Sequence, residues 1–266
     1  MRVEGKRVLI TGASSGIGSA LAAVFARKRA TLVLVSRRSD HLGEVAMQIG
    51  CTFPHSPTPL ALPCDVANRE SVRVLAESCV DHLGGIDIWI NNAGISVYGD
   101  AEKTTLDDFH AVMDVNFFGA LHCMLEAIPR MKRQGAGLIV NIASVAAKHG
   151  VPYLGAYCAS KAALAALSQS LRAELSSAGV SIMVVYPGYT QTNIFRNEKN
   201  VGGGRRPPGP FAPASKVAEA IVKAIEREKQ ELVLSLEGRA LALLSGLLPR
   251  LVGKVMERTA ARLRDG

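Results

Sequence analysis

The sequence has no run of eighteen consecutive apolar residues, so we expect no membrane-spanning helix. Its first seven residues are mostly polar and lead straight into an apolar run, which argues against a secretory signal peptide. The five cysteines are scattered without a Cys-x-x-Cys pair, and the six histidines show no metal-ligand spacing. We therefore expect free thiols in a reducing, cytoplasmic compartment and no metal site.

Aromatic residues are scarce, at 5% of the chain, and no aromatic-rich basic motif accompanies the formal net charge of +8. This combination argues against a nucleic-acid partner and leaves acidic lipid or an anionic cofactor to explain the charge. The 266 residues are 48% hydrophobic and contain no internal repeat. These features predict one globular domain, residues 1–266, with a large core.

A glycine-rich turn follows the first apolar run, residues 7–11, and precedes a helical pattern over residues 20–29. Gly12 permits a tight turn, Gly16 allows backbone to approach a pyrophosphate, and Gly18 lets the helix pack close to the sheet. The order strand, turn, helix predicts a phosphate-binding site at the helix N-terminus.

The second predicted strand, residues 31–36, ends at Arg37 and Arg38, and no acidic residue occurs before Asp40. In dinucleotide-binding folds, an acid at this point binds the ribose 2′-hydroxyl, whereas an arginine accommodates a 2′-phosphate. Since guanidinium suits phosphate geometry, the pair favours NADP over NAD. The alternative is a pair of solvated loop arginines.

Further strands and helices alternate along the chain, which predicts a parallel sheet with right-handed crossovers. We expect strands at 60–64, 86–90, 137–144, 180–185 and 231–235, a loop at 51–59, and helices at 69–82, 105–133, 157–177 and 215–228. Open α/β sheets bind ligands at the carboxyl ends of their strands. Six predicted strand ends carry polar, glycine or proline residues: Gly12, Arg37, Asp65, Asn91, Ser144 and Pro187.

Three side chains near one of these strand ends form a candidate proton-handling group. Tyr157 and Lys161 lie one helical turn apart and so point to one face, with Ser144 at the preceding strand end. Ser144 can hydrogen-bond a substrate oxygen, and Tyr157 can give it or take from it a proton. We expect the ammonium of Lys161 to lower the pKa of Tyr157. Asn116, in an apolar helical run, is either a structural kink or part of a proton path.

The region after the sixth strand has two parts of different character. Residues 189–214 are irregular and rich in glycine and proline, which predicts a substrate lid. In residues 236–264, an apolar segment ends at Pro249, and basic residues then recur every four positions. Such a segment could lie at a membrane interface, pack against a second subunit or cover the substrate mouth.

Together these motifs resemble the short-chain dehydrogenase/reductase family. The resemblance extends over residues 11–192, in the family's order and spacing. It implies a Rossmann-type, doubly wound parallel seven-stranded sheet with helices on both faces, a nicotinamide cofactor and a homodimer or homotetramer. The matching residues are Thr11, Gly12, Gly16, Gly18, Asp65, Val66, Asn91, Asn92, Ala93, Gly94, Asn116, Ser144, Tyr157, Lys161, Pro187, Gly188 and Thr192.

The resemblance also implies a role for each residue. Tyr157 would be the acid/base, Lys161 would bind the nicotinamide ribose, Ser144 would orient the substrate and Asn116 would hold a water. The pyrophosphate would meet Gly12, Ser14, Ser15, Gly16, Ile17 and Gly18; the adenosine part would meet Arg37, Arg38, Asp65, Val66, Asn92, Ala93 and Gly94; the nicotinamide would meet Pro187, Gly188 and Thr192. The C-terminal segment is loosely similar to 11β-hydroxysteroid dehydrogenase-like members.

These inferences predict an NADP-dependent oxidoreductase acting on a ketone or secondary alcohol, with an apolar or lipid-like substrate. A second hypothesis is a 3-oxoacyl-thioester reductase whose acidic carrier protein contacts Arg205 and Arg206. A third is a catalytically idle NADP-binding sensor or scaffold, against which the complete set of catalytic residues argues.

Overall fold

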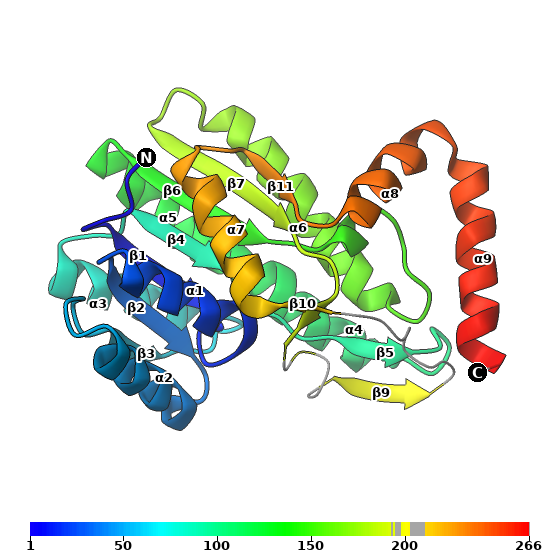
Figure 1. Cartoon of the computed structure of the whole chain (residues 1–266), viewed down its shortest axis with the longest axis horizontal. Helices are drawn as coiled ribbons and strands as arrows, with labels where there is room; N and C mark the ends of the chain where they lie inside the picture. The colour runs from blue at the N-terminus through cyan, green and yellow to red at the C-terminus, as the bar shows by residue number, and fades with distance from the viewer. Residues whose placement is uncertain (193, 195–197, 203–210, 266) are drawn as a thin grey trace.

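Seven parallel strands form the central sheet of the computed structural model, which describes residues 1–192, 194, 198–202 and 211–265. The spatial order is β11-β7-β6-β4-β1-β2-β3 (Figure 1). The strands are β1 (Arg7–Thr11), β2 (Thr31–Ser36), β3 (Leu60–Pro63), β4 (Ile88–Asn91), β6 (Gly137–Ile142), β7 (Val180–Tyr186) and β11 (Glu231–Val233). The order reverses between β1 and β4, and such a switch point is where open α/β sheets bind ligands.

Helices cover both faces of the sheet. One layer contains α1 (Gly16–Arg27), α2 (Ser39–Thr52) and α7 (Ala214–Glu226); the other contains α3 (Arg69–Leu83), α5 (Gly119–Gln134) and α6 (Gly155–Glu174). Successive strand residues face opposite layers, so every β1 residue from Val8 to Ile10 is buried. This explains why the strands read as continuous apolar runs. The predicted Rossmann-type parallel sheet is confirmed.

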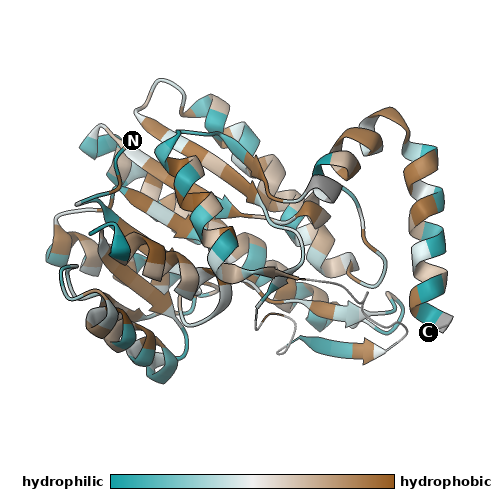
Figure 2. Cartoon of the chain, viewed as in Figure 1, coloured by the Kyte–Doolittle hydropathy of each residue, from teal (hydrophilic) through white to brown (hydrophobic). Residues whose placement is uncertain are grey.

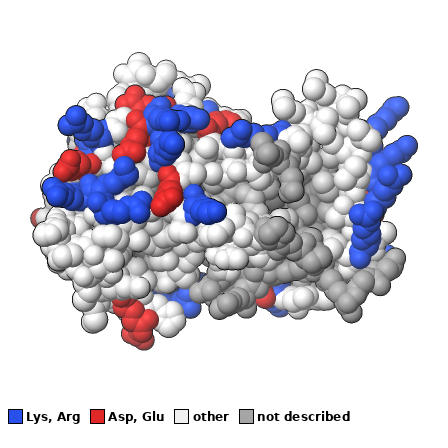
Figure 3. All heavy atoms as spheres, in the orientation of Figure 1, with Lys and Arg blue, Asp and Glu red and all other residues white. Residues whose placement is uncertain are grey.

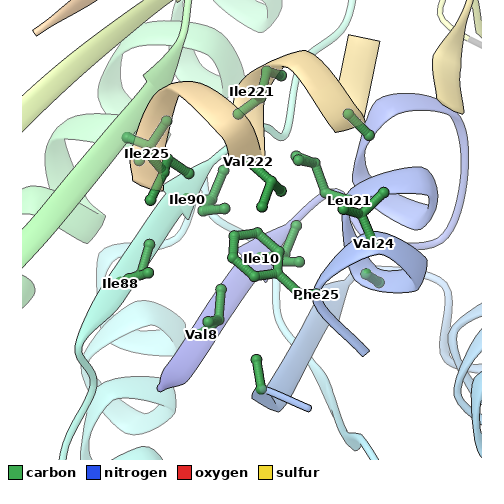
Figure 4. Close-up of a cluster of buried hydrophobic side chains, with 14 of the residues drawn as sticks. Val8, Ile10, Leu21, Val24, Phe25, Ile88, Ile90, Ile221, Val222 and Ile225 are labelled. Carbon is green, nitrogen blue, oxygen red and sulfur yellow. The ribbon is translucent and has the colours of Figure 1, made fainter. Parts of the chain in front are cut away.

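Buried apolar side chains from β1, β4, α1 and α7 pack together in one core cluster (Figure 4). Val8 and Ile10 of β1 meet Phe25 of α1 and Val222 of α7 in this cluster. Because α1 follows the first glycine-rich turn directly, this packing fixes the position of its N-terminus at the carboxyl edge of the sheet.

A row of polar side chains crosses the opposite layer. Asn91 of β4 donates from Nδ2 to Oδ1 of Asn141 on β6 at 2.8 Å, and Asn141 Nδ2 donates to Ser168 Oγ on α6 at 2.8 Å. Asn91 and Asn141 face each other directly in the ladder. All three side chains are buried, so each hydrogen bond replaces one to water and links α6 to the middle of the sheet.

The predicted helix at 105–133 contains a break in its hydrogen-bond pattern. It consists of α4 (Leu106–Met113), a π-helical segment (Asp114–Phe118) and α5. The stretch Leu106–Gln134 is long and apolar enough to cross a membrane by length and composition. Its Cys123 and Met124 nevertheless belong to the apolar core beneath the sheet, as in a core helix of a globular domain.

The structure differs from the sequence-based expectations in two segments. Helix α2 was not expected, and because it extends to Thr52, the loop expected at 51–59 begins only after that residue. The predicted lid contains short strands: β8 (Thr190–Gln191) pairs with β10 (Ala212–Pro213), and β9 (Lys199–Gly202) pairs with β5 (Val97–Gly99). The rest of that segment, with Arg205 and Arg206, lies outside the described residues.

The C-terminal segment forms two helices that extend from one end of the domain (Figure 1). They are α8 (Leu236–Leu247) and α9 (Pro249–Asp265), so the predicted break at Pro249 is confirmed.

Candidate functional site

A cavity of about 670 Å³ lies at the carboxyl edge of the sheet, a size typical of ligand sites. Residues at or just after the ends of β1, β2, β3, β4, β6 and β7 line it, as the sequence predicts. The expected site residues along its wall are Gly12, Ser14, Ser15, Gly16, Ile17, Arg37, Arg38, Asp65, Val66, Asn92, Ala93, Gly94, Ser144, Tyr157, Lys161, Pro187, Gly188 and Thr192.

The turn between β1 and α1 can be formed only with glycine at its key positions. Gly12 and Gly16 have φ values of +65° and +59°, which side chains rarely allow. A Cβ on Gly12 would also lie 2.9 Å from the Cα of Ala93, and one on Gly16 would lie 3.0 Å from the Cβ of Thr192. The turn therefore brings unhindered backbone and the N-terminus of α1 to the cavity, where N–H groups can bind an anion.

Gly18 has a packing role away from the cavity wall. A Cβ at this position would overlap the carbonyl oxygen of Gly12. Gly18 thus lets α1 pack tightly against the turn, as expected from its position, but among the described residues it is not part of the cavity lining. Its contact with a pyrophosphate therefore stays a prediction.

Asn92 ties the turn after β4 to the turn after β1. Its Nδ2 donates to the carbonyl oxygens of Thr11 at 2.9 Å and Gly12 at 3.2 Å. The hydroxyl of Thr11 accepts from the backbone N–H groups of Asn92 and Ala93 at 3.0 and 3.1 Å. These bonds hold two neighbouring turns as one rigid wall on either side of the switch point.

Two arginines stand at the end of the cavity next to β2. Arg37 and Arg38 are exposed, and neither forms an ion pair with any described residue. Asp65, after β3, is the only acidic residue among the described lining residues, and its Oδ1 accepts from the N–H of Ala67 at 3.1 Å. This end of the cavity therefore contains two guanidinium groups without an ion-pair partner among the described residues. It also contains the carboxylate of Asp65, which already accepts a backbone hydrogen bond.

Ser144, Tyr157 and Lys161 meet in the middle of the cavity wall. Ser144 follows β6, and its hydroxyl accepts from the N–H of Ala146 at 3.2 Å and hydrogen-bonds with Tyr157. Lys161 is 3% exposed, and its Nζ donates to the carbonyl of Ile142 at 2.9 Å and lies 5.8 Å from the centre of the Tyr157 ring. Helix α6 thus places the phenol and the ammonium beside the serine hydroxyl.

The electrostatics of this group differ from the expectation. Burial raises the pKa of Tyr157 to about 12, and the hydrogen bond with Ser144 opposes that rise. Burial also lowers the pKa of Lys161 to about 8. The predicted lowering of the Tyr157 pKa by Lys161 is therefore wrong for this structure, because burial of the phenol outweighs the hydrogen bond with Ser144, the one effect that lowers this pKa.

Asn116 lies behind the cavity wall in the π-helical segment. Its Oδ1 accepts from the N–H of Ile95 at 2.8 Å, while its Nδ2 donates to the carbonyl of Ile95 and the hydroxyl of Ser160, both at 2.9 Å. Among the described residues it is not part of the cavity lining. The side chain therefore clamps the Ile95 backbone against α6, one residue from Gly94, and the π-helical turn is the kink that the sequence allowed.

Thr192 presents an unused polar atom on the cavity wall, next to Gly16 of the first glycine-rich turn. Its Oγ1 is buried and has no hydrogen-bond partner among the described residues. The nearby Gly188 accepts from the hydroxyl of Thr190 at 2.9 Å, and Pro187 accepts from the N–H of Val145 at 2.9 Å. The buried hydroxyl of Thr192 fits a ligand with an amide or similar polar group.

The sequence did not reveal the apolar part of the wall. Val145, Val151, Leu154 and Tyr189 line the cavity beside Ser144 and Tyr157, and the Tyr189 ring stacks on Phe211 at 5.6 Å between centroids. Three of the four lie in the loop between β6 and α6, and Tyr189 lies directly after Gly188. Apolar loop residues follow no periodic pattern, so periodicity could not identify them. Only their proximity in sequence to Ser144, Tyr157 and Gly188 could have indicated that they line the cavity.

Comparison with known proteins settles the family. A family model described as "short chain dehydrogenase" matches residues 6–201. The chain belongs to the short-chain dehydrogenase/reductase family. It is 36% identical over 272 residues to the "Dehydrogenase/reductase SDR family protein 7-like" of Anopheles gambiae, covering 99% of this chain and 86% of that protein. It is also 36% identical over 233 residues to the "Ketoacyl reductase HetN" of a Nostoc strain, covering 88% and 79%.

Solved structures of this family share the fold. A Burkholderia phymatum short-chain dehydrogenase/reductase in complex with NAD superposes with a TM-score of 0.84 and 26% identity, covering 94% of this chain and 96% of that one. A Burkholderia cenocepacia short chain dehydrogenase in complex with NADP gives 0.82 and 25%, covering 96% and 99%. The chain is thus an oxidoreductase of a nucleotide-binding family, and these two solved members hold NAD and NADP respectively.

Proposed function

We propose that this protein transfers a hydride between NADP(H) and a ketone or secondary alcohol, with Tyr157 as the acid/base. The observation that carries the proposal is the meeting of Ser144, Tyr157 and Lys161 on the wall of one cavity. That cavity also contains a phosphate-binding turn at one end and an apolar wall beside the serine and tyrosine. An acid/base group, a nucleotide site and a substrate surface are therefore contiguous.

The residues of the cavity fit a nicotinamide dinucleotide along its length. The amides at the start of α1 would bind the pyrophosphate, and the unpartnered hydroxyl of Thr192 would bind the carboxamide. Arg37 and Arg38 would bind a 2′-phosphate, and no acidic residue of β2 competes with them; this supports NADP over NAD. When bound, the cofactor supplies the hydride chemistry, and the protein supplies position and proton transfer.

The protein's own groups then handle the substrate oxygen. Ser144 donates a hydrogen bond to it, which fixes the carbonyl against the tyrosine. Because its pKa is about 12, Tyr157 holds its proton at neutral pH and can donate it to the oxygen during reduction. With a pKa of about 8, Lys161 is mostly protonated at neutral pH, and it places a positive charge 5.8 Å from the centre of the Tyr157 ring.

The substrate class follows from the wall next to Ser144. Val145, Val151 and Leu154 offer aliphatic surface and Tyr189 an aromatic ring. Apolar surface removed from water stabilises a bound ligand by about 25 cal/mol per Å². This favours a largely apolar ketone or alcohol.

Turnover with NADPH and a panel of apolar ketones tests the proposal. We expect Tyr157→Phe to lower kcat by about a hundredfold or more, because general acid catalysis contributes factors of about 10² to 10⁴. Tyr98→Phe serves as the control, since Tyr98 is buried outside the described cavity lining. Equal turnover in Tyr157→Phe and wild type would refute the role of the phenol. No turnover of any substrate by the wild type would favour an idle nucleotide-binding module.

A second candidate activity is reduction of 3-oxoacyl thioesters. The 36% identity to the ketoacyl reductase from Nostoc favours it, and the net charge of +8 suits an acidic carrier protein. Turnover of a 3-oxoacyl thioester on carrier protein should then exceed turnover of the same acyl group on a short thiol. Arg205→Ala/Arg206→Ala should abolish that difference; equal rates on both thiols would rule out carrier recognition.

A further inference from the structure

The bend between α8 and α9 exposes an unusual amount of apolar surface. Six of the fourteen exposed large apolar side chains among the described residues lie between positions 243 and 255. We call them the apolar elbow: Leu243, Leu244, Leu247, Leu248, Leu251 and Val255. Three of them lie on α8, Leu251 and Val255 lie on α9, and Leu248 lies at the bend between the two helices. Figure 2 shows hydrophobic residues at this bend. Contiguous apolar surface of this kind marks an interaction site.

Basic side chains adjoin the apolar elbow. Arg250, Lys254, Arg258 and Arg262, which we call the basic stripe, are all exposed, and none forms an ion pair with a described residue. Figure 3 shows lysine and arginine gathered along the α9 edge of the molecule beside the uncharged surface over α8. Between residues 249 and 264, Glu257 is the only acid in the sequence. The surface thus combines an apolar ridge with uncompensated positive charge.

The other side of α9 is held by the domain. Val252 and Leu263 are buried, at 4% and 8% exposure, and the hydroxyl of Tyr153 donates to the carbonyl of Ala260 at 3.0 Å. Tyr153 precedes Tyr157 by four residues, in the segment that leads into α6. Helix α9 therefore has one side that contacts the domain, and the apolar elbow lies on the exposed side.

We propose that the apolar elbow and the basic stripe dock this protein on an anionic lipid surface. Leucines exposed at the bend would enter the acyl boundary, and the arginines and lysine would stay at the phosphate level. A second copy of the chain fits this surface less well. A two-fold contact between two such faces would bring two basic stripes together, and like charges repel.

Docking in this manner would also place the cavity near lipid, an implication that depends on the proposed function. Gly238, in the first turn of α8, has no room for a side chain because Val145 of the cavity wall lies against it. Tyr153 links α9 to the segment before Tyr157. The apolar wall and the lipid-facing elbow are therefore joined, as suits an apolar substrate that arrives from a membrane.

Co-sedimentation with vesicles tests the docking without any measure of catalysis. We expect the wild type to pellet with phosphatidylcholine vesicles containing phosphatidylserine at low ionic strength, and much less with phosphatidylcholine alone. Leu247→Glu should lower the partition coefficient by about tenfold or more, because it removes a 75%-exposed leucine from the apolar ridge and adds a negative charge. Met47→Glu is the matched control: Met47 is 72% exposed, lies on α2, and should leave binding unchanged.

A second pair of variants isolates the charge. Arg258→Gln should lower binding to the anionic vesicles by about fivefold, the contribution of one basic residue near such a surface. Arg133→Gln, at an exposed arginine of α5, should not. Circular dichroism and thermal unfolding would verify that each variant is folded.

Three results would overturn the proposal. The first is no pelleting with anionic vesicles at low ionic strength. The second is equal loss of binding in Met47→Glu and Leu247→Glu, which would locate the contact elsewhere. The third is a halved molar mass of Leu247→Glu in light scattering without a change in lipid binding, which would assign the elbow to a second copy of the chain. Failure of the ketone assay would leave these results unaffected.

Discussion

At the scale of single residues, Arg37 carries the choice between the two nicotinamide dinucleotides. We expect Arg37→Ala to weaken NADPH binding about ten- to a hundredfold, since a hydrogen bond to a charged group contributes roughly 1.5–3 kcal/mol. NADH binding should change little, because NADH lacks the 2′-phosphate. Fluorescence titration with both cofactors measures the difference, and Arg133→Ala serves as a control on exposed charge. If NADH binds as tightly as NADPH in the wild type, the two arginines are solvated loop residues.

Lys161 should give the protein a distinctive pH dependence. Its pKa is lowered to about 8 by burial, against 10.5 for an unperturbed lysine, so between these values the unfolded chain binds more protons than the folded chain. The free energy of unfolding therefore rises with pH in this window. Relative to Lys161→Met, the wild type should gain about 2 kcal/mol between pH 8 and pH 10.

Urea unfolding of both proteins at several pH values measures this gain. The comparison with the variant is necessary because burial also raises the pKa values of Cys64 and Cys79, to about 11 and about 12. Those thiols lower stability at alkaline pH equally in both proteins. Parallel pH profiles for the wild type and Lys161→Met would contradict the assignment of a buried, easily deprotonated lysine.

At the scale of elements, the contact between α1 and the first turn depends on Gly18. A methyl group there would overlap the Gly12 carbonyl, so Gly18→Ala must displace α1 or the turn. We expect a loss of about 1–3 kcal/mol in the free energy of unfolding, and weaker cofactor binding, because overpacking strains a tight site. Chemical denaturation and NADPH titration measure the two effects.

Helix α2 offers the matched control for that substitution. Gly43 lies inside the helix, and a Cβ added to it would meet no atom within 4 Å. Gly43→Ala should therefore stabilise the protein by about 0.5–1 kcal/mol, since alanine has the higher helix propensity. An equal loss of stability in Gly18→Ala and Gly43→Ala would show that the close approach of α1 is unimportant.

The same helix explains one limit of prediction from sequence. Only Leu42 and Ile49 of α2 are buried, and Gly43 and Gly50 weaken its helical pattern. The inner strands, by contrast, are mostly buried on both faces and form largely apolar runs, which made β1, β2 and β7 easy to locate. The pairings of β5 with β9 and β8 with β10 join short segments distant in sequence, and no local pattern indicates them.

At the scale of the whole molecule, the site could be predicted because the fold collects strand ends at one edge. Residues such as Gly12, Asp65 and Ser144, spread over more than a hundred positions, line one cavity for that reason alone. The sequence could not reveal the burial that governs the pKa values of Tyr157 and Lys161, nor the apolar wall. Both depend on how loops and helices close over the edge, which three-dimensional packing determines.

The buried row of Asn91, Asn141 and Ser168 has a consequence for how the strands find their alignment. A strand that is apolar on both sides would lose little hydrophobic contact by sliding along its neighbour, so apolar burial specifies its alignment weakly. Asn91 and Asn141 can pair only when they stand opposite each other, and any slip would leave two amides unpaired in the core. The two amides thus specify one register between β4 and β6. Because Asn141 also binds Ser168, they fix the position of α6, and with it Tyr157, relative to these strands.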